Sequence, residues 1–186
     1  GLILGVPGRV NVENATAAIT LALEAGVTPE EIRAALPEFR GVVRRFNIHA
    51  DTGEKMYIDD YAHHPKEIEA TLKSVREMWP NKKLTVVFQP HLYTRTRDFY
   101  PEFAKSLSLA DRVILLDIYP ARELPIPGVT SEIIREQITV PAEILSKEAL
   151  LEYIGTRFDE GVIMTVGAGD IDRMIPAITQ KILQQS

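Results

Sequence analysis

Short apolar runs alternate with amphipathic segments through most of this 186-residue chain. Ile68, Leu72 and Val75 recur at spacings of three and four, which predicts a helix over 65–79. Fully apolar strands that are joined by helical crossovers form parallel sheets with both faces covered. The alternation therefore predicts an α/β fold, a mostly parallel sheet with flanking helices. Its further strands are expected at 84–88, 113–116, 142–145 and 162–166, and its further helices at 99–109, 130–138, 147–157 and 171–184.

Two shorter units precede this alternation. Residues 11–39 have the pattern of a helical hairpin, in which Gly26 follows the end of the first helix. A capping box then starts the second helix, with Thr28 as the N-cap and Glu31 as its partner. A β-hairpin is expected next, with strands at 45–50 and 55–58.

Charge and composition exclude several classes of protein. The chain has 21 Lys and Arg against 26 Asp and Glu, a net charge of −5, so an extended nucleic-acid surface is not expected. It has no cysteine, which excludes disulfides and thiolate metal sites. No apolar run approaches the ~20 residues of a membrane span, and no secretion signal is visible. We therefore expect a cytoplasmic protein without a membrane span.

Polar residues gather where the apolar run at 55–58 ends. Asp59, Asp60, Tyr61, His63 and His64 follow it directly, and a proline then starts the next helix. In parallel sheets, ligands bind beyond the carboxyl ends of the strands. The positive end of the helix dipole disfavours a cation, so a neutral imidazole that accepts a proton or orients an amine is expected here. We interpret this segment as functional rather than as a capped turn with solvated histidines.

A second polar segment follows the apolar run at 84–88. It contains His91, Arg95, Arg97 and Asp98 before the predicted start of a helix at residue 99. Two arginines in a loop can clamp a carboxylate or a phosphate through paired hydrogen bonds. The alternative is a salt-bridged loop in which Asp98 caps the helix and pairs with an arginine. The residues alone favour neither interpretation.

Two further segments leave structural and functional interpretations open. The turn at 167–170 is either an anion-binding glycine turn or a tight turn in which Asp170 caps the last helix. The proline-rich loop at 118–129 is either functional or a rigid connector. The pattern G-x-x-x-x-G-K-S/T does not occur, so these residues contain no P-loop. A metal site on Asp60, His63 and His91 is disfavoured because no H-x-H or H-E-x-x-H pattern supports it.

The order of the polar segments is more specific than any one of them. Together they resemble the Mur ligase family, and the resemblance covers essentially the whole chain. The segments that carry it are GRVNVENA (8–15), GVVRRF (41–46), DDYAHHP (59–65), FQPHLYTRTRD (88–98) and GAGDI (167–171). Because the family has three domains, the resemblance implies that residues 1–42 end its central ATP-binding domain and that 43–186 form its Rossmann-like C-terminal domain.

The resemblance also implies a reaction. It is the ATP-dependent addition of L-alanine to UDP-N-acetylmuramate in peptidoglycan synthesis, through an acyl phosphate, with Mg²⁺ bound mainly by the part of the central domain that this chain lacks. By position, the ATP-contacting residues are Asn14, Arg45 and Asp60. The residues around the incoming amino acid are Tyr61, His63, His91 and Arg95, and the catalytic assignments are His63 and Arg95. No resident metal is assigned to this chain, which is expected to be inactive alone.

Two residues depart from the family pattern. Val10 stands where many relatives have a histidine that stacks on adenine, and Leu92 stands where some have another arginine. Three alternatives stay open: a ligase that recycles murein tripeptide, a stand-alone nucleotide-binding module, and a metal-dependent hydrolase. Apolar helix faces in residues 1–40 are expected to cause self-association or disorder when the rest of their domain is missing.

Overall fold

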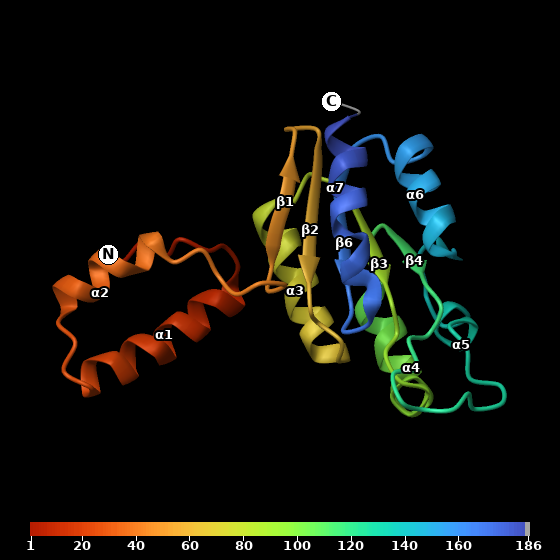
Figure 1. Ribbon diagram of the computed structural model, residues 1–186, viewed down its shortest axis with the longest axis horizontal. Coiled ribbons are helices and arrows are strands. Elements are labelled where there is room, and N and C mark those ends of the chain that lie inside the picture. Colours follow the sequence, from red (N-terminus) through yellow and green to blue (C-terminus); the bar gives the residue numbers. More distant parts are fainter. Residues whose placement is uncertain (185–186) are drawn as a thin grey trace.

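The computed structural model describes residues 1–184, and its centre is one mixed sheet (Figure 1). The strand order is β1-β2-β6-β3-β4-β5, and every neighbouring pair is parallel except β1 and β2, which form an antiparallel hairpin. The predicted mostly parallel α/β fold is therefore confirmed. The strands are β1 (Asn47–Asp51), β2 (Lys55–Asp60), β3 (Leu84–Phe88), β4 (Arg112–Leu115), β5 (Ala142–Ile144) and β6 (Gly161–Val166).

Helices cover both faces of the sheet. They are α3 (Pro65–Met78), α4 (Tyr93–Leu107), α5 (Glu132–Arg135), α6 (Lys147–Thr156) and α7 (Ile175–Leu183), with the 3₁₀ helix η2 (Asp170–Met174) before α7. Successive strand residues point to opposite faces, so Phe88 packs with Leu72 of α3 and Phe103 of α4 in one core. Its neighbour Val87 packs with Ile154 and Ile178, on α6 and α7, in the other. This two-sided burial explains why the strand sequences are continuously apolar.

The N-terminal helices stand apart from the sheet (Figure 1). They are α1 (Arg9–Glu24), α2 (Pro29–Ala35) and the 3₁₀ helix η1 (Leu36–Glu38). The predicted capping box is confirmed: the Glu31 backbone N–H donates to Thr28 Oγ1 at 3.3 Å, and the Thr28 N–H donates to Glu31 Oε2 at 2.8 Å. Gly26 adopts φ +88°, as a glycine after a helix end does. Residues 39–46 connect this hairpin to β1.

One predicted helix boundary is wrong by six residues. The sequence predicts a helix from residue 99, but α4 begins at Tyr93. The polar residues before 99 provide no local side-chain cap, and the N-cap residue Leu92 adopts φ +73°. Arg95 therefore lies in the first turn of a helix rather than in a loop. This helix start also decides whether Arg95 and Arg97 can face the same binding site.

Candidate functional site

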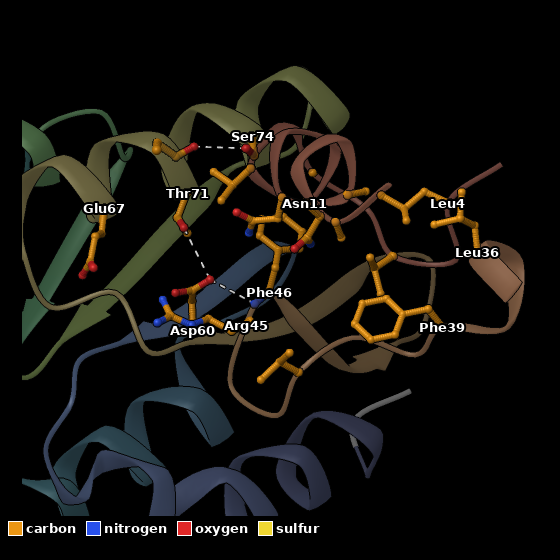
Figure 2. A pocket seen from close by; sticks show the side chains of 18 of the residues that line it. Leu4, Asn11, Leu36, Phe39, Arg45, Phe46, Asp60, Glu67, Thr71 and Ser74 are labelled. Atoms are coloured by element: carbon orange, nitrogen blue, oxygen red, sulfur yellow. Dashed lines mark hydrogen bonds between the residues drawn. The ribbon is translucent and has the colours of Figure 1, made fainter. Parts of the chain in front are cut away.

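A large hollow lies between the N-terminal hairpin and the sheet domain (Figure 2). Its volume is about 1060 Å³. The three predicted ATP-contacting residues all line it: Asn14 from α1, Arg45 from the connecting segment and Asp60 from the end of β2. These residues are 46 positions apart in the sequence at most, and only the fold brings them to one cavity. Whether they bind ATP stays a prediction.

Asp60 is held by the protein's own hydrogen bonds at the base of this cavity (Figure 2). The Phe46 N–H donates to Asp60 Oδ2 at 2.9 Å, and the Ala62 N–H donates to Asp60 Oδ1 at 2.7 Å. The Thr71 hydroxyl adds a longer contact of 3.4 Å to Oδ2. Burial raises the pKa of Asp60, although both backbone hydrogen bonds oppose that shift. The carboxylate therefore ties the connecting segment to the end of β2 as well as lining the cavity.

The cavity has one apolar and one polar side. Leu4, Leu36 and Phe39 supply apolar surface from the N-terminal unit. Most polar groups come from the opposite wall, where α3 and the end of β2 contribute Lys66, Glu67, Thr71, Ser74 and Asp60, while Asn11 and Asn14 add amides from α1. Apolar walls with a few convergent polar groups are typical of small-molecule sites. This arrangement suits a flat heterocycle attached to a polar, charged tail.

A row of four rings lies beside this cavity, beyond the carboxyl ends of the parallel strands. The Tyr61 and His63 rings are 5.1 Å apart, the His63 and His91 rings 6.5 Å, and the His91 and Tyr119 rings 5.8 Å. Tyr61 follows β2, His91 follows β3 and Tyr119 follows β4. The loops after β2, β3 and β4 thus meet at one site at the same end of the sheet, as expected for ligand binding in a parallel sheet.

His63 is oriented by two groups of its own loop and helix. Its Nδ1 lies 2.9 Å from the Tyr61 carbonyl oxygen and 3.4 Å from Glu67 Oε2. Glu67 also accepts the backbone N–H groups of His63 and His64, at 3.0 and 3.1 Å, and so caps the start of α3. Because a carbonyl oxygen only accepts, the Nδ1 nitrogen is the donor in this contact. In the neutral form of the ring, the other nitrogen, Nε2, is then the acceptor.

Two nitrogens near the row have no partner within the described chain. His91 Nδ1 and Arg95 Nη1 are both buried without a hydrogen bond. Burial lowers the pKa of His91, and the positive charge of Arg95 and the nearby His63 lower it further. A buried guanidinium nitrogen without an acceptor is unusual, and an anionic ligand is one way to satisfy it. The structure therefore places Arg95 beside His91, with capacity for a carboxylate.

Arg97 does not join Arg95. Its Nε pairs with Asp98 at 2.7 Å, and its side chain is 53% exposed. Because both arginines lie on α4, a separation of two residues turns them to different sides of the helix. Of the two interpretations, the clamp of two arginines is therefore wrong. The alternative is confirmed in that Asp98 pairs with an arginine, but wrong in that Asp98 caps the helix, because α4 begins at Tyr93.

The glycine turn after β6 is filled by the protein itself. A Cβ on Gly169 would lie 2.4 Å from Gln89 Oε1 and 2.8 Å from Tyr119 Cβ. Gln89 Oε1 accepts the Ile171 N–H at 2.9 Å, and Gln89 Nε2 donates to Asp170 at 2.9 Å. Of the two interpretations, the tight turn describes this geometry, although Asp170 bonds Gln89 instead of capping the helix.

Three residues at the site were missed in the sequence analysis. Arg44 lies over the Tyr61 ring at 5.1 Å, Tyr119 stacks on His91, and Glu123 bonds to the start of α4. Arg44 is adjacent to the predicted Arg45, and the other two lie in the proline-rich loop, so their segments were identified but not their roles. Across residues 1–184, no group of three or more His, Asp or Glu side chains is arranged to hold a metal ion.

None of the helices within residues 1–184 combines the length and the apolar character needed to cross a membrane.

Comparison with known families identifies the class of protein to which this fold belongs. The family described as "Mur ligase, glutamate ligase domain" matches residues 44–169. This is more than half of the chain, and the chain belongs to the Mur ligase family.

The similar proteins include one particular kind of Mur ligase. UDP-N-acetylmuramate–L-alanine ligase of Porphyromonas gingivalis W83 is 52% identical over 97% of this chain, and that of Flavobacterium johnsoniae is 46% identical over all of it. The solved UDP-N-acetylmuramate-alanine ligase of Thermotoga maritima superposes with a TM-score of 0.75 at 34% identity, over 99% of this chain and 39% of the other. The chain spans about 40% of the length of the curated relatives it matches.

A murein peptide ligase of Psychrobacter arcticus also has this fold. Its TM-score is 0.66 at 24% identity, over 99% of this chain and 38% of the other. At that identity the similarity shows the fold alone.

Proposed function

We propose that this chain is the C-terminal part of an ATP-dependent ligase that joins L-alanine to UDP-N-acetylmuramate in the cytoplasm, as a step of peptidoglycan synthesis. One observation carries the proposal: a cavity lined by Asn14, Arg45 and Asp60 adjoins the ring row, in which His91 lies near the unpaired Arg95. The two sites meet at the end of β2, where Asp60 is the last strand residue and Tyr61 follows it. A nucleotide and an amino acid can thus be held side by side, as amide-bond formation from an activated carboxylate needs.

The cavity is the proposed ATP site. Its apolar wall accommodates the adenine ring, while the Asn14 amide supplies hydrogen bonds and Arg45 supplies positive charge for the phosphates. Asp60 lies at the position expected for a contact to the ribose. Mg²⁺ is proposed to bind mainly to residues outside this chain.

Arg95 and the histidines form the proposed L-alanine site. Arg95 Nη1 binds the carboxylate of the amino acid, because it is a buried donor without an internal acceptor. His63 Nε2 accepts a proton from the amine or orients it. An oxygen of the muramoyl carboxylate takes the γ-phosphoryl group of ATP as ADP leaves, and the free amine then attacks the acyl carbon. The tetrahedral intermediate collapses as the C–O bond to phosphate breaks, which leaves the amide and inorganic phosphate.

The complete gene product provides the first test. We expect phosphate release that requires ATP, UDP-N-acetylmuramate and L-alanine together, whereas the 186-residue chain alone is expected to release none. Release that depends on a murein tripeptide instead of L-alanine would identify the recycling ligase. Absence of release with either acceptor would leave a nucleotide-binding module.

Variants of the same protein separate the two sites. Arg95→Ala is expected to raise KM for L-alanine by about tenfold or more, since it removes a charged hydrogen-bond donor. Asn14→Ala and Arg45→Ala are expected to raise KM for ATP with little effect on KM for L-alanine. Arg97→Ala is the matched control because Arg97 is exposed on the same helix turn and pairs with Asp98. An Arg97→Ala effect as large as that of Arg95→Ala would contradict the assignment.

A further inference from the structure

The start of α4 is capped from a distant loop. Leu92 is the N-cap residue, and no side chain of the helix's own N-terminal residues accepts the orphan N–H groups. Glu123 of the proline-rich loop does so instead. Glu123 Oε2 accepts the Thr94 backbone N–H at 2.9 Å, and Glu123 Oε1 accepts the Thr94 hydroxyl. The hydrogen bonds from Thr94 also hold the pKa of Glu123 below its usual value, so the side chain stays an anion near neutral pH.

The same loop is bonded to the segment before α4. The Tyr119 N–H donates to the Pro90 carbonyl at 2.8 Å, and the Leu92 N–H donates to the Tyr119 carbonyl at 2.9 Å. His91 and Tyr119 form a parallel bridge between these contacts, and their rings stack. The loop after β4 and the loop after β3 are therefore joined at two places, on either side of His91.

Strained backbone marks both partners of this junction. Leu92 adopts φ +73° and Ala121 adopts φ +51°, a region that residues other than glycine rarely occupy. Such conformations persist only when surrounding contacts hold them. Here the Glu123–Thr94 contact lies two residues beyond each of them, so it is placed to maintain both.

Arg95 is the residue that this junction positions. It directly follows Thr94 in the first turn of α4, and its Nη1 has no hydrogen-bond partner within the described chain. His91 precedes the helix and stacks on Tyr119 of the capping loop. The relative placement of Arg95 and His91 thus depends on how the loop is fastened to the helix start. Glu123 itself bonds Thr94 rather than Arg95.

We propose that Glu123 is a positioning residue of the amino-acid site: by capping α4 through Thr94, it fixes Arg95 and His91 where they bind the carboxylate of L-alanine. The inference rests on the proposed function. Glu123 acts through hydrogen bonds, so a glutamine at this position keeps the geometry. The glutamine oxygen accepts the Thr94 N–H and its NH₂ donates to the Thr94 hydroxyl.

The test uses four variants and one control variant in the complete ligase. Glu123→Ala loses both bonds and is expected to raise KM for L-alanine about tenfold, with kcat and KM for ATP changed less than about threefold. Thr94→Val loses only the hydroxyl bond and is expected to raise KM for L-alanine by about threefold. Glu123→Gln and Thr94→Ser keep both bonds and are expected to stay within about twofold of the wild type. Glu102→Ala, on the exposed surface of α4, is the control.

A double variant tests whether the two residues act as one contact. Glu123→Ala combined with Thr94→Val is expected to match Glu123→Ala alone, because partners in one interaction are not additive. Thermal unfolding of each variant separates positioning from general loss of structure. Equal rises in KM for ATP and L-alanine, or an unchanged KM for L-alanine in Glu123→Ala, would overturn the inference while the wild type remains an alanine ligase. A wild type without L-alanine-dependent release would overturn the proposed function and this inference together.

Discussion

Arg44 Nε donates a hydrogen bond to Asp59 Oδ2 at 3.3 Å, and the Asp59 side chain is fully buried. Arg44 Nη2 also donates to the Gly167 carbonyl at 2.6 Å, 123 residues away. The segment before β1 is thereby fastened to the ends of β2 and β6. Burial raises the pKa of Asp59, and the charge of Arg44 opposes that shift. The arginine thus compensates a carboxylate that the sheet hides from water.

Removing Arg44 is expected to destabilise the fold strongly. Arg44→Ala leaves the carboxylate of Asp59 buried without its charged partner, and such a loss is typically about 3–5 kcal/mol of unfolding free energy. Arg40→Ala is the control, because Arg40 pairs with Glu38 at an exposed site where both side chains are 79% accessible. That variant is expected to stay within about 0.5 kcal/mol of the wild type. Denaturant titration measures both, and equal stabilities of the two variants would refute the role of Arg44.

Gly169→Ala is expected to disturb the site by contact rather than by backbone strain. Gly169 adopts φ −83°, which any residue tolerates, but the new methyl group would overlap Gln89 and Tyr119. Overpacking of this kind typically costs about 1–3 kcal/mol. Gly53→Asn is the control, since Gly53 faces open space and asparagine accepts its positive φ. Equal unfolding midpoints for the two variants would show that the turn has room for a side chain.

Two histidines are expected to make stability depend on pH. Burial lowers the pKa of both His49 and His91 in the folded chain, and Arg95 adds to the effect at His91. The unfolded chain therefore takes up protons first as the pH falls through about 6.5, the usual pKa of histidine. The folded state loses stability below that pH and regains it above.

Single variants isolate this pH effect. His91→Gln and His49→Gln are each expected to flatten the dependence of the unfolding free energy between about pH 7.5 and 5.5. Asp59 and Asp60 have raised pKa values, so their contribution has the opposite sign, and the comparison must be made between variant and wild type. An unchanged slope in both variants would contradict burial as the cause.

The N-terminal hairpin is expected to cause self-association of the 186-residue chain. Helix α1 buries none of its residues, and Leu21, Val12 and Leu23 are 71%, 55% and 47% exposed. Apolar residues on an unpartnered helix promote association in water. Sedimentation velocity is expected to show concentration-dependent oligomers that Leu21→Lys weakens. A monodisperse monomer at high concentration would be the contrary result.

Local patterns determined the elements of this fold. The apolar run at Leu84–Phe88 predicted β3 without error, because a strand covered on both faces needs apolar residues throughout. The capping box at Thr28 was predicted correctly because its two partners are three residues apart. The candidate site residues Tyr61, His63, His91 and Arg95 were chosen from segments that end strands, and the parallel order of the sheet brings those ends together.

The tertiary structure decided which distant side chains cap a helix and which residues share a cavity. The start of α4 could not be predicted, because its cap is Glu123, 29 residues further along the chain. That helix start also turned Arg95 and Arg97 to different sides, so that Arg95 Nη1 is buried at the site and Arg97 is exposed beside Asp98. The hollow shared by Asn14, Arg45 and Asp60 exists only because the N-terminal hairpin folds back toward α3. Periodicity and capping act over one or two turns, whereas a buried carboxylate or an orphan N–H group takes whichever partner the packed sheet brings near.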